Sequence, residues 1–270
     1  MLVLLTGILY NEVIVRLLRD WWTDANYSHG LLIPFFSGFV VWRKRQLLAA
    51  LPVKPCWIGA VVVAGALAML IVGALGAELY LSRASLVFLL AGGIILFFGW
   101  THFRAVLFAW ACLFLMIPLP AIIFNQITLP LQLLASRVAT WSLAIIGIPV
   151  LRLGNIIELP TMQVEVAEAC SGIRSLVSLG TVAVIYGYLA QEIVWRRTAL
   201  VIFAVPIAVL ANGARITLTG MVAQYWNPDT AKGVFHEFSG WVVFLLSIAM
   251  LLLVHRGLRM MHGWQNRRTE

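Results

Sequence analysis

Apolar runs long enough to cross a lipid bilayer recur along almost the whole chain. About 20 apolar residues are needed for one crossing, because a helix rises about 1.5 Å per residue and the hydrocarbon core is roughly 30 Å thick. Asn11, Glu12 and Arg16 interrupt the first run, so that segment either spans the membrane or lies on its surface. The pattern predicts an all-α polytopic membrane protein with about eight transmembrane helices, near residues 2–18, 27–42, 56–77, 84–100, 104–124, 172–191, 198–224 and 235–255.

Two segments between these runs have a different pattern. Residues 151–169 contain short stretches that alternate polar and apolar side chains, such as Gln163-Val164-Glu165-Val166, which predicts a small β-hairpin on the membrane surface. Residues 126–150 predict one interfacial or re-entrant helix, because polar side chains recur in it at helix-like spacing, at Gln126, Gln132, Ser136, Arg137 and Thr140.

Composition supports one membrane domain over residues 1–270. Hydrophobic residues make up 62% of the chain and charged residues only 11%, and the mean hydropathy is +0.95, which a water-soluble domain would not tolerate on its surface. The formal charge of +8 would suit nucleic acid. The bases, however, form short clusters beside apolar runs, such as Arg43-Lys44-Arg45, and this arrangement is typical of a topology signal. We therefore expect membrane lipids as partners and no nucleic acid.

The basic clusters also predict an orientation. Eleven of the nineteen Lys and Arg residues are cytoplasmic if residues 43–54, 101–104, 191–197 and 255–270 lie inside. The basic tail, 256–270, is then cytoplasmic, and His255 beside it is expected to be a plain interface residue. Segment 126–150 cannot be a full crossing in this arrangement. The hairpin at 151–169 and Cys170 face outward.

The stretch VEVAEACSGIRSL, residues 164–176, is unusually polar for this chain. Cys56 and Cys112 each stand alone in apolar runs, where cysteine is a common small filler. Cys170 instead follows Glu168 at the outer mouth of a helix, and it is the only cysteine expected there, which leaves a free thiol. One Cys and one His fall short of a four-ligand zinc site, so we predict no metal and no other cofactor.

Three further polar residues are expected at the depth of Cys170. The helix that begins after Arg196-Arg197 climbs about 27 Å before it reaches Arg215, and Asn212 precedes Arg215 on about the same face. The chain re-enters the membrane at His236. A thiol is nucleophilic as thiolate, which a nearby imidazolium or guanidinium favours. An arginine can stabilise an oxyanion and a histidine can protonate a leaving amine, so the set suits acyl transfer.

Other polar residues near the outer face have more than one interpretation. His29, in Asn26-Tyr27-Ser28-His29-Gly30, either lines the same vestibule or caps a helix. Arg174 is a catalytic helper, a clamp for a substrate carboxylate or a partner of Glu168. For Glu165 and Glu168 we favour local ion pairing over acid/base chemistry.

The chain resembles the exosortase/archaeosortase family of polytopic membrane cysteine transpeptidases. The resemblance rests on Glu168-Ala169-Cys170-Ser171-Gly172-Ile173-Arg174, on Asn212 through Arg215-Ile216, on His236, and on residues 26–30 leading into Trp42-Arg43-Lys44-Arg45. It implies that Cys170 is the nucleophile and that Arg215 and His236 assist it. It also implies a bacterial inner-membrane enzyme whose site faces the periplasm.

The same resemblance implies the substrates. They are exported proteins that end in a short motif, typically Pro-Glu-Pro in bacterial systems, followed by a transmembrane helix and a basic cluster. The acceptor of the acyl group is an unidentified amine or water. Two other classes stay open: a polytopic transporter or envelope-polysaccharide assembly factor without cysteine catalysis, and a non-catalytic membrane scaffold. If the protein is a transporter, Cys170→Ala should keep its function. If it is a scaffold, Cys170, Arg215 and His236 should all tolerate replacement.

Overall fold

The computed structural model of the protein describes residues 2–76, 78–166, 172–190, 193–226 and 234–266. For residues 2–4, 234–237 and 261–266 it describes the backbone alone. The chain is 81% helical with a single small sheet among the described residues, which agrees with the predicted all-α class. It forms two compact units, residues 1–121 and 122–270.

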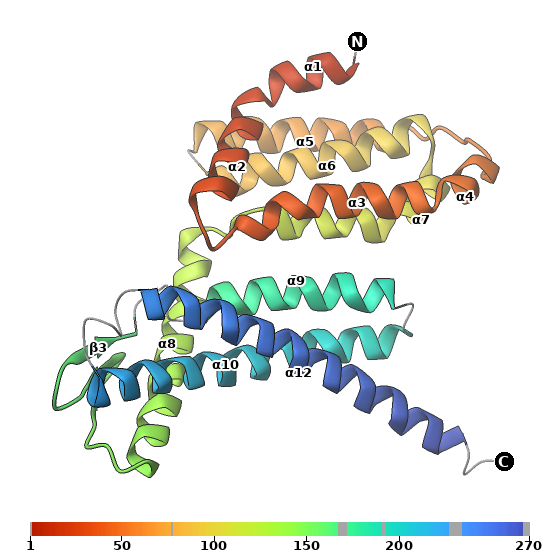
Figure 1. The fold of residues 1–270 in the computed structure, drawn as a ribbon. Coiled ribbons are helices and arrows are strands. Elements are labelled where there is room, and N and C mark those ends of the chain that lie inside the picture. Colours follow the sequence, from red (N-terminus) through yellow and green to blue (C-terminus); the bar gives the residue numbers. More distant parts are fainter. Residues whose placement is uncertain (1, 77, 167–171, 191–192, 227–233, 267–270) are drawn as a thin grey trace. The chain divides into compact units, whose positions relative to one another are not determined.

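The first unit consists of helices (Figure 1). The helices α5 (Ile58–Leu75) and α6 (Leu79–Phe97) lie side by side, and Gly59 and Gly92 stand where the two backbones approach closely. A β-carbon built at Gly59 would lie 2.3 Å from the backbone nitrogen of Leu96, so no larger residue fits there. The elements are α1 (Leu2–Leu9), α2 (Asn11–Thr23), the 3-10 helix η1 (Ser28–Leu31), α3 (Leu32–Arg43), α4 (Arg45–Ala50), α5 (Ile58–Leu75), α6 (Leu79–Phe97), α7 (Trp100–Cys112) and the 3-10 helix η2 (Leu113–Met116).

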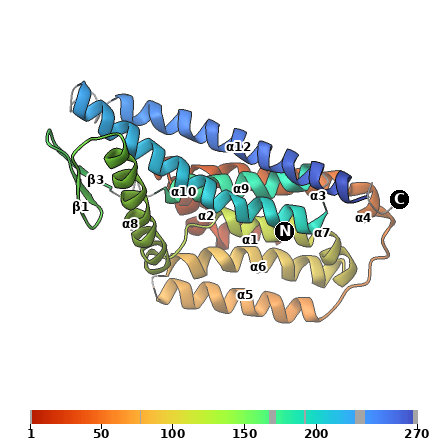
Figure 2. The same cartoon turned by 90° about the horizontal axis from the view of Figure 1, so that it is seen from below.

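The second unit combines helices with the sheet. Its elements are α8 (Ala121–Ile145, whose first residue ends the first unit), β1 (Leu151–Leu153), β2 (Ile156–Glu158), β3 (Gln163–Glu165), α9 (Ile173–Leu189), α10 (Val194–Tyr225) and α12 (Val234–Asn266). Within this unit α9, α10 and α12 lie side by side (Figures 1 and 2). The strands pair antiparallel in the order β1-β2-β3. A buried cluster that includes Ala139 of α8, Ile157 of β2 and Ile216 of α10 packs the sheet against the C-terminal half of α10.

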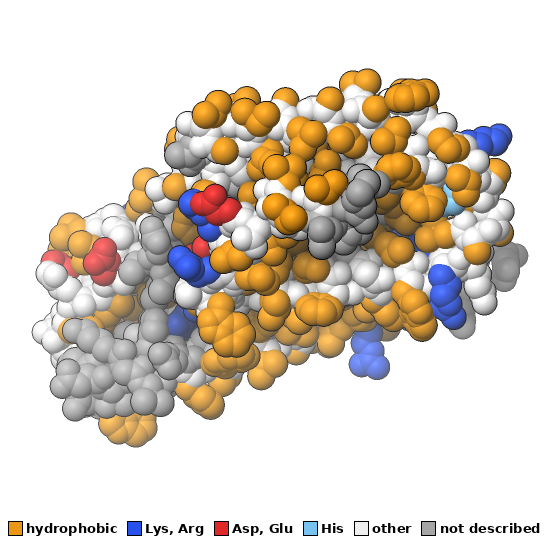
Figure 3. Space-filling model, turned by 90° about the horizontal axis from the view of Figure 1, so that it is seen from above, with side chains coloured by type: hydrophobic (Ala, Val, Ile, Leu, Met, Phe, Trp, Pro, Cys, Tyr) orange, Lys and Arg blue, Asp and Glu red, His pale blue; other side chains and the backbone are white. Residues whose placement is uncertain are grey.

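Several helices are suited to lipid surroundings. Four described helices are long and apolar enough to cross a membrane: Ile58–Leu75, Leu79–Phe97, Val194–Tyr225 and Phe238–Met260. A fifth crossing exists if Trp100–Met116 and Ala121–Ile145, which are separated by a short break, together form one span. Large apolar side chains are widely exposed, and hydrophobic side chains are spread over the face seen in Figure 3. The chain is a multi-pass membrane protein, and the number of eight spans stays a prediction.

The predicted helix boundaries are wrong at three places. The run 2–18 is divided into α1 and α2 at Tyr10, which is completely buried. In segment 27–42 the α-helix begins only at Leu32. This helix, α3, has 12 residues, and the short 3-10 helix η1 precedes it. Segment 104–124 is interrupted after Met116, where Pro118 and Pro120 occupy the junction with α8. Proline lacks the N–H that a continuing helix requires.

Two smaller expectations are corrected in the second unit. The predicted hairpin is a sheet of three strands, because Leu151–Leu153 pairs with β2 on the side opposite to β3. Residues 167–169 of the predicted hairpin lie outside the described residues. His255 is no plain interface residue: it is 5% exposed on α12 and stands edge-on to Tyr186, with ring centroids 5.1 Å apart. The helix α12 continues through the predicted tail to Asn266.

Candidate functional site

The sequence-predicted site is described in part. Cys170 and Glu168 lie outside the described residues, and for His236 only the helical backbone of α12 is described. The described part of the chain includes residues close to them in sequence, because α9 begins at Ile173, and it includes Asn212 and Arg215 of α10. The candidate site is therefore built from the contacts among α9, α10 and α12.

Gly172 forms the junction between the Cys170 segment and α9. It is the N-cap of α9 and has a left-handed backbone with φ of +80°, which glycine adopts without steric cost. A β-carbon built there would lie 3.1 Å from both the Cβ and the Cγ of Asn212. The Asn212 side chain is 3% exposed on α10. The backbone at Gly172, two residues after Cys170, thus packs directly against the side chain of Asn212.

Arg215 lies one turn after Asn212 and reaches the third helix. Its side chain is half-buried, and the guanidinium lies along the surface of α12 at Gly240. A β-carbon built at Gly240 would be 3.4 Å from Nη2 and 3.5 Å from Cζ of Arg215. A methyl group at Gly240 would make ordinary van der Waals contact, whereas a branched side chain would displace the guanidinium. The guanidinium of Arg215 therefore lies within van der Waals reach of position 240, between α10 and α12.

The backbone position of His236 can be placed relative to Arg215. The helices α10 and α12 run antiparallel, since Arg215 meets Gly240 while Ile207 and Leu251 share a core cluster closer to the start of α10. His236 stands four residues before Gly240, about one helical turn. Its helix position is therefore about one turn beyond Arg215, toward the end of α10. Asn212, Arg215 and position 236 share one end of the second unit.

The β-sheet is at this same end. Ile157 of β2 and Ile216, the neighbour of Arg215, belong to one buried cluster. Counted along α10, Arg215 is 21 residues from Val194, or about 32 Å, which is close to the roughly 30 Å of a hydrocarbon core. The sequence prediction that the hairpin, Asn212 and Arg215 share one level agrees with these contacts.

The remaining predicted residues are placed less centrally. Arg174 is exposed in the first turn of α9, and Glu165 is exposed at the end of β3. His29 belongs to the first unit, where its Nε2 lies 3.2 Å from the carbonyl oxygen of Leu115 and joins η1 to η2. Burial lowers the pKa of His29, and hydrogen bonds with the backbone of Leu115 and Asn26 oppose that shift. The structure gives His29 a bridging role within its own unit.

Sequence reasoning missed Gly240 and the contact made by Gly172. Neither was predictable from spacing along one helix, because each glycine is defined by a side chain on another helix. One signal was present in the sequence: Gly240 follows His236 by four residues and therefore shares its helix face. The two other cysteines agree with their predicted role as fillers. Cys112 is 3% exposed, and Cys56 packs against the buried cluster of α6 and α7.

Comparison with known proteins identifies the family. A family model described as transmembrane exosortase matches residues 21–253 and so runs through both compact units. No curated protein and no solved structure matches the chain. The matched range includes Cys170, Arg215 and His236 as well as the contacts of Gly172 with Asn212 and of Arg215 with Gly240. The chain belongs to the transmembrane exosortase family.

Proposed function

We propose that this protein is a membrane cysteine protease and transpeptidase that cleaves the C-terminal sorting signal of exported proteins. Family membership supports a sorting role in the membrane. The observation that carries the finer proposal is the meeting of three helices at one end of the second unit. There Gly172, two residues after Cys170, contacts Asn212, and Arg215 reaches α12 one turn from the position of His236.

In the proposed first step, Cys170 loses its proton to His236 and the thiolate attacks the scissile carbonyl carbon. The π electrons of the carbonyl move onto its oxygen and create a tetrahedral oxyanion. Arg215 stabilises that charge through hydrogen bonds from its guanidinium, which presents several donors in a fixed plane. The partly buried position of Arg215 strengthens this interaction, because charges interact more strongly where water is excluded.

In the proposed second step, the tetrahedral intermediate collapses. The carbon–nitrogen bond breaks, the leaving amine takes the proton from the His236 imidazolium, and a thioester to Cys170 remains. An acceptor amine or water then attacks the thioester carbonyl, its proton passes to His236, and the thiolate leaves. The two steps use the same three side chains and require no cofactor.

The supporting residues receive roles from their placement. Asn212 holds the backbone at Gly172 and so positions the Cys170 segment. Arg174, exposed in the first turn of α9, is suited to a substrate carboxylate, such as the glutamate of a Pro-Glu-Pro motif. Glu168 is proposed as a local charge partner. His29 contributes through the fold of the first unit. The proposed location is the bacterial inner membrane, with the site facing the periplasm and the C-terminus in the cytoplasm.

Coexpression with a candidate substrate tests this function. The substrate carries a Pro-Glu-Pro motif, a tail helix and a basic cluster, and an immunoblot reports its shortening. Cys170→Ala and Cys170→Ser should abolish shortening without lowering the protein level, while Cys56→Ala, a cysteine of the first unit, should retain it. Normal shortening by well-folded Cys170→Ala would contradict the proposal and favour the transporter or assembly-factor alternative.

A further inference from the structure

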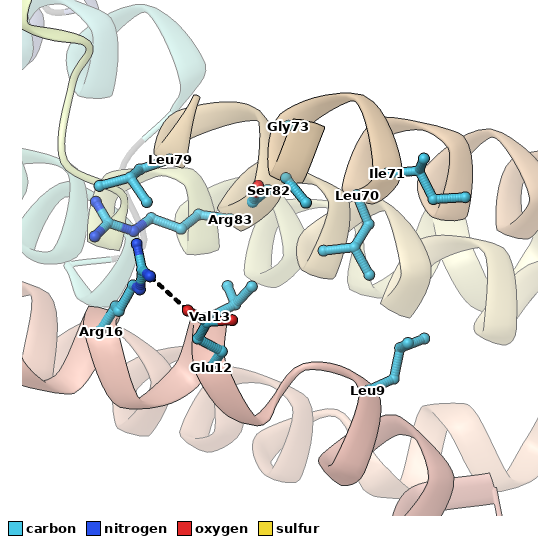
Figure 4. A pocket seen from close by; sticks show the side chains of 11 residues that line it. Leu9, Glu12, Val13, Arg16, Leu70, Ile71, Gly73, Leu79, Ser82 and Arg83 are labelled. Atoms are coloured by element: carbon cyan, nitrogen blue, oxygen red, sulfur yellow. Dashed lines mark hydrogen bonds and ion pairs between the residues drawn. The ribbon is translucent and has the colours of Figure 1, made fainter. Parts of the chain in front are cut away.

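The first unit contains a pocket of about 460 Å³ between α1–α2 and α5–α6 (Figure 4). All its lining residues belong to this unit, and none belongs to the proposed catalytic set. Its volume is within the range of small-molecule and cofactor sites, roughly 300–1,000 Å³. The pocket is therefore separate from the residues proposed to act with Cys170.

The pocket has one polar end and one apolar end. Arg16 and Arg83 lie at the polar end together with Leu79, near the start of α6, Ser82 lies between the two ends, and Leu9 and Ile71 lie at the opposite end (Figure 4). Such a gradient over one cavity fits a ligand that has a charged head and an apolar chain. A ligand of uniform polarity would leave one end poorly matched.

Two contacts hold the walls of the pocket together. The buried hydroxyl of Tyr10, at the α1–α2 junction, accepts a hydrogen bond of 3.1 Å from Ser85 of α6. Farther along α2, Asp20 forms an ion pair with Arg83, whose side chain is only 4% exposed. The lining residues Val13 and Arg16 of α2 lie between these anchors. The anchors fix α2 against α6, so the cavity is part of the packed unit.

The direction of the pocket agrees with the predicted membrane orientation. Two contacts mark the basic end of the first unit. Nζ of Lys44 donates a hydrogen bond to the carbonyl oxygen of Ala105, and the backbone N–H of Lys54 donates one to the carbonyl oxygen of Phe98. That end is cytoplasmic by the positive-inside rule. The polar end of the pocket is at the opposite end of α5 and α6, beside their connection. A phospholipid in the outer leaflet has the same orientation, with its phosphate at the interface and its chains pointing to the bilayer centre.

We propose that this pocket binds one outer-leaflet phospholipid. Arg16 holds the phosphodiester, an acyl chain lies along the apolar wall, and Arg83 supplies positive potential while it remains paired with Asp20. Arg16 is available for exchange because its pair with Glu12 is exposed, with 52% and 77% of the two side chains accessible, and such pairs contribute little to stability.

A substrate's tail helix fits less well than a lipid. A helix about 10 Å wide that rises about 1.5 Å per residue would place only about four residues in this volume, whereas a membrane-spanning tail needs about 20. An acyl chain is narrower and can enter the pocket lengthwise. The observations thus favour the lipid over the peptide.

Native mass spectrometry of the detergent-solubilised protein tests the lipid site. Phosphatidylethanolamine and phosphatidylglycerol are offered separately, beside glycerol phosphate and a substrate tail peptide. We expect one retained phospholipid on the wild type and no retention of glycerol phosphate, which has no acyl chain. Arg16→Gln should reduce retention about tenfold, since it removes a charge-assisted hydrogen bond. Arg19→Gln is the matched control, because Arg19 is exposed on the same helix but does not line the pocket.

A second pair of variants tests the apolar wall. Ala74→Trp should fill the pocket and lower retention, while Val61→Trp, at a 71% exposed position of α5 outside the pocket, should not. Equal losses in Arg16→Gln and Arg19→Gln, or undiminished retention in Ala74→Trp, would overturn the lipid site. Preferential binding of the tail peptide would overturn it also. Substrate shortening reports separately on Cys170, so failure of the lipid site leaves the proposed function standing.

Discussion

The two compact units use polar residues in different ways. In the first unit, described polar side chains tie helices to one another: Arg83 pairs with Asp20, Trp21 donates to the Met116 carbonyl at 2.9 Å, and Ser37 donates to the Ala109 carbonyl at 2.9 Å. In the second unit, Asn212 and Arg215 instead lie against glycines of neighbouring helices. The first set of contacts joins helices through hydrogen bonds and an ion pair, and the second brings a glycine of one helix close to a polar side chain of another.

This difference separates structural polar groups from candidate catalytic ones. A buried charge in a membrane protein is costly unless it is paired or wetted, and such a residue is a functional candidate by default. The burial of the Arg83 charge is explained by its ion pair with Asp20. Arg215 lies against Gly240, about one helical turn from position 236 of α12, and its role on a bound substrate is our proposal. Changes at matched positions of the two units should therefore affect different properties.

The largest effect is expected at Arg215. Arg215→Lys keeps the charge but loses the planar fork of donors, so substrate cleavage should fall about 100-fold or more, as when one oxyanion donor is lost. Arg137→Lys, at an exposed position of α8, should keep nearly full activity. The rate of tail-peptide cleavage in detergent measures both. Full activity of Arg215→Lys would remove Arg215 from the proposed mechanism.

In the first unit, the largest effect should be on stability. Asp20→Ala leaves the buried guanidinium of Arg83 without this partner and should destabilise the protein by about 2–3 kcal/mol, a value reduced from that of a fully buried pair because Asp20 is 34% exposed. Glu12→Ala removes the exposed pair with Arg16 and should change stability by less than about 0.5 kcal/mol. The thermal unfolding midpoints of Asp20→Ala, Glu12→Ala and the wild type are measured in the same detergent. Equal shifts would show that burial of Arg83 is unimportant.

The sequence predicted the long apolar helices well. Within a few residues, the runs at 56–77, 172–191 and 198–224 correspond to α5, α9 and α10, because a bilayer requires long continuous apolar segments. Short elements were predicted poorly. The break at Tyr10 depends on its burial against α6, and the first strand of the sheet depends on pairing with β2, so both are set by tertiary contacts.

The residue types of the candidate site were proposed from the sequence and their roles stay predictions, whereas their contacts could not be predicted from it. The predicted depth of Arg215 rests on its distance along a helix from the basic cluster at Arg196-Arg197. The close approaches at Gly172 and Gly240 require the relative rotation of three helices, which periodicity on one helix does not contain. The pair between Asp20 and Arg83 was missed for the same reason, since 63 residues separate the two.

Gly172 offers a smaller and more local test of the second unit. Gly172→Ala places a side chain on a left-handed backbone and 3.1 Å from Asn212, so we expect activity to fall about tenfold, from a cost of about 1–2 kcal/mol. Gly180→Ala is the control within the same helix, because a β-carbon there would meet nothing within 4 Å. Peptide cleavage and thermal unfolding are measured together. Equal behaviour of the two variants would show that the Gly172 turn does not position the Cys170 segment.

The smallest effect is the pH dependence contributed by His29 in the first unit. Its folded-state pKa is lowered by burial, so the unfolded chain binds a proton more readily. The stability contribution of neutral His29 is therefore present above the unfolded pKa, about 6.5, and is lost as pH falls below it. Thermal unfolding from about pH 8 to pH 5 should decline less in His29→Gln than in the wild type. Parallel curves would show that His29 does not contribute.

The most direct test of the central claim is mass spectrometry of Cys170 after reaction with a substrate tail peptide. The solubilised protein is quenched in acid and digested, and the Cys170 peptide is examined for an acyl thioester that hydroxylamine removes. We predict this adduct in the wild type and a strongly reduced yield in Arg215→Lys and His236→Ala, with the protein folded in each case. Cleavage of the peptide by Cys170→Ala, or equal adduct yields in the wild type and both variants, would contradict the account.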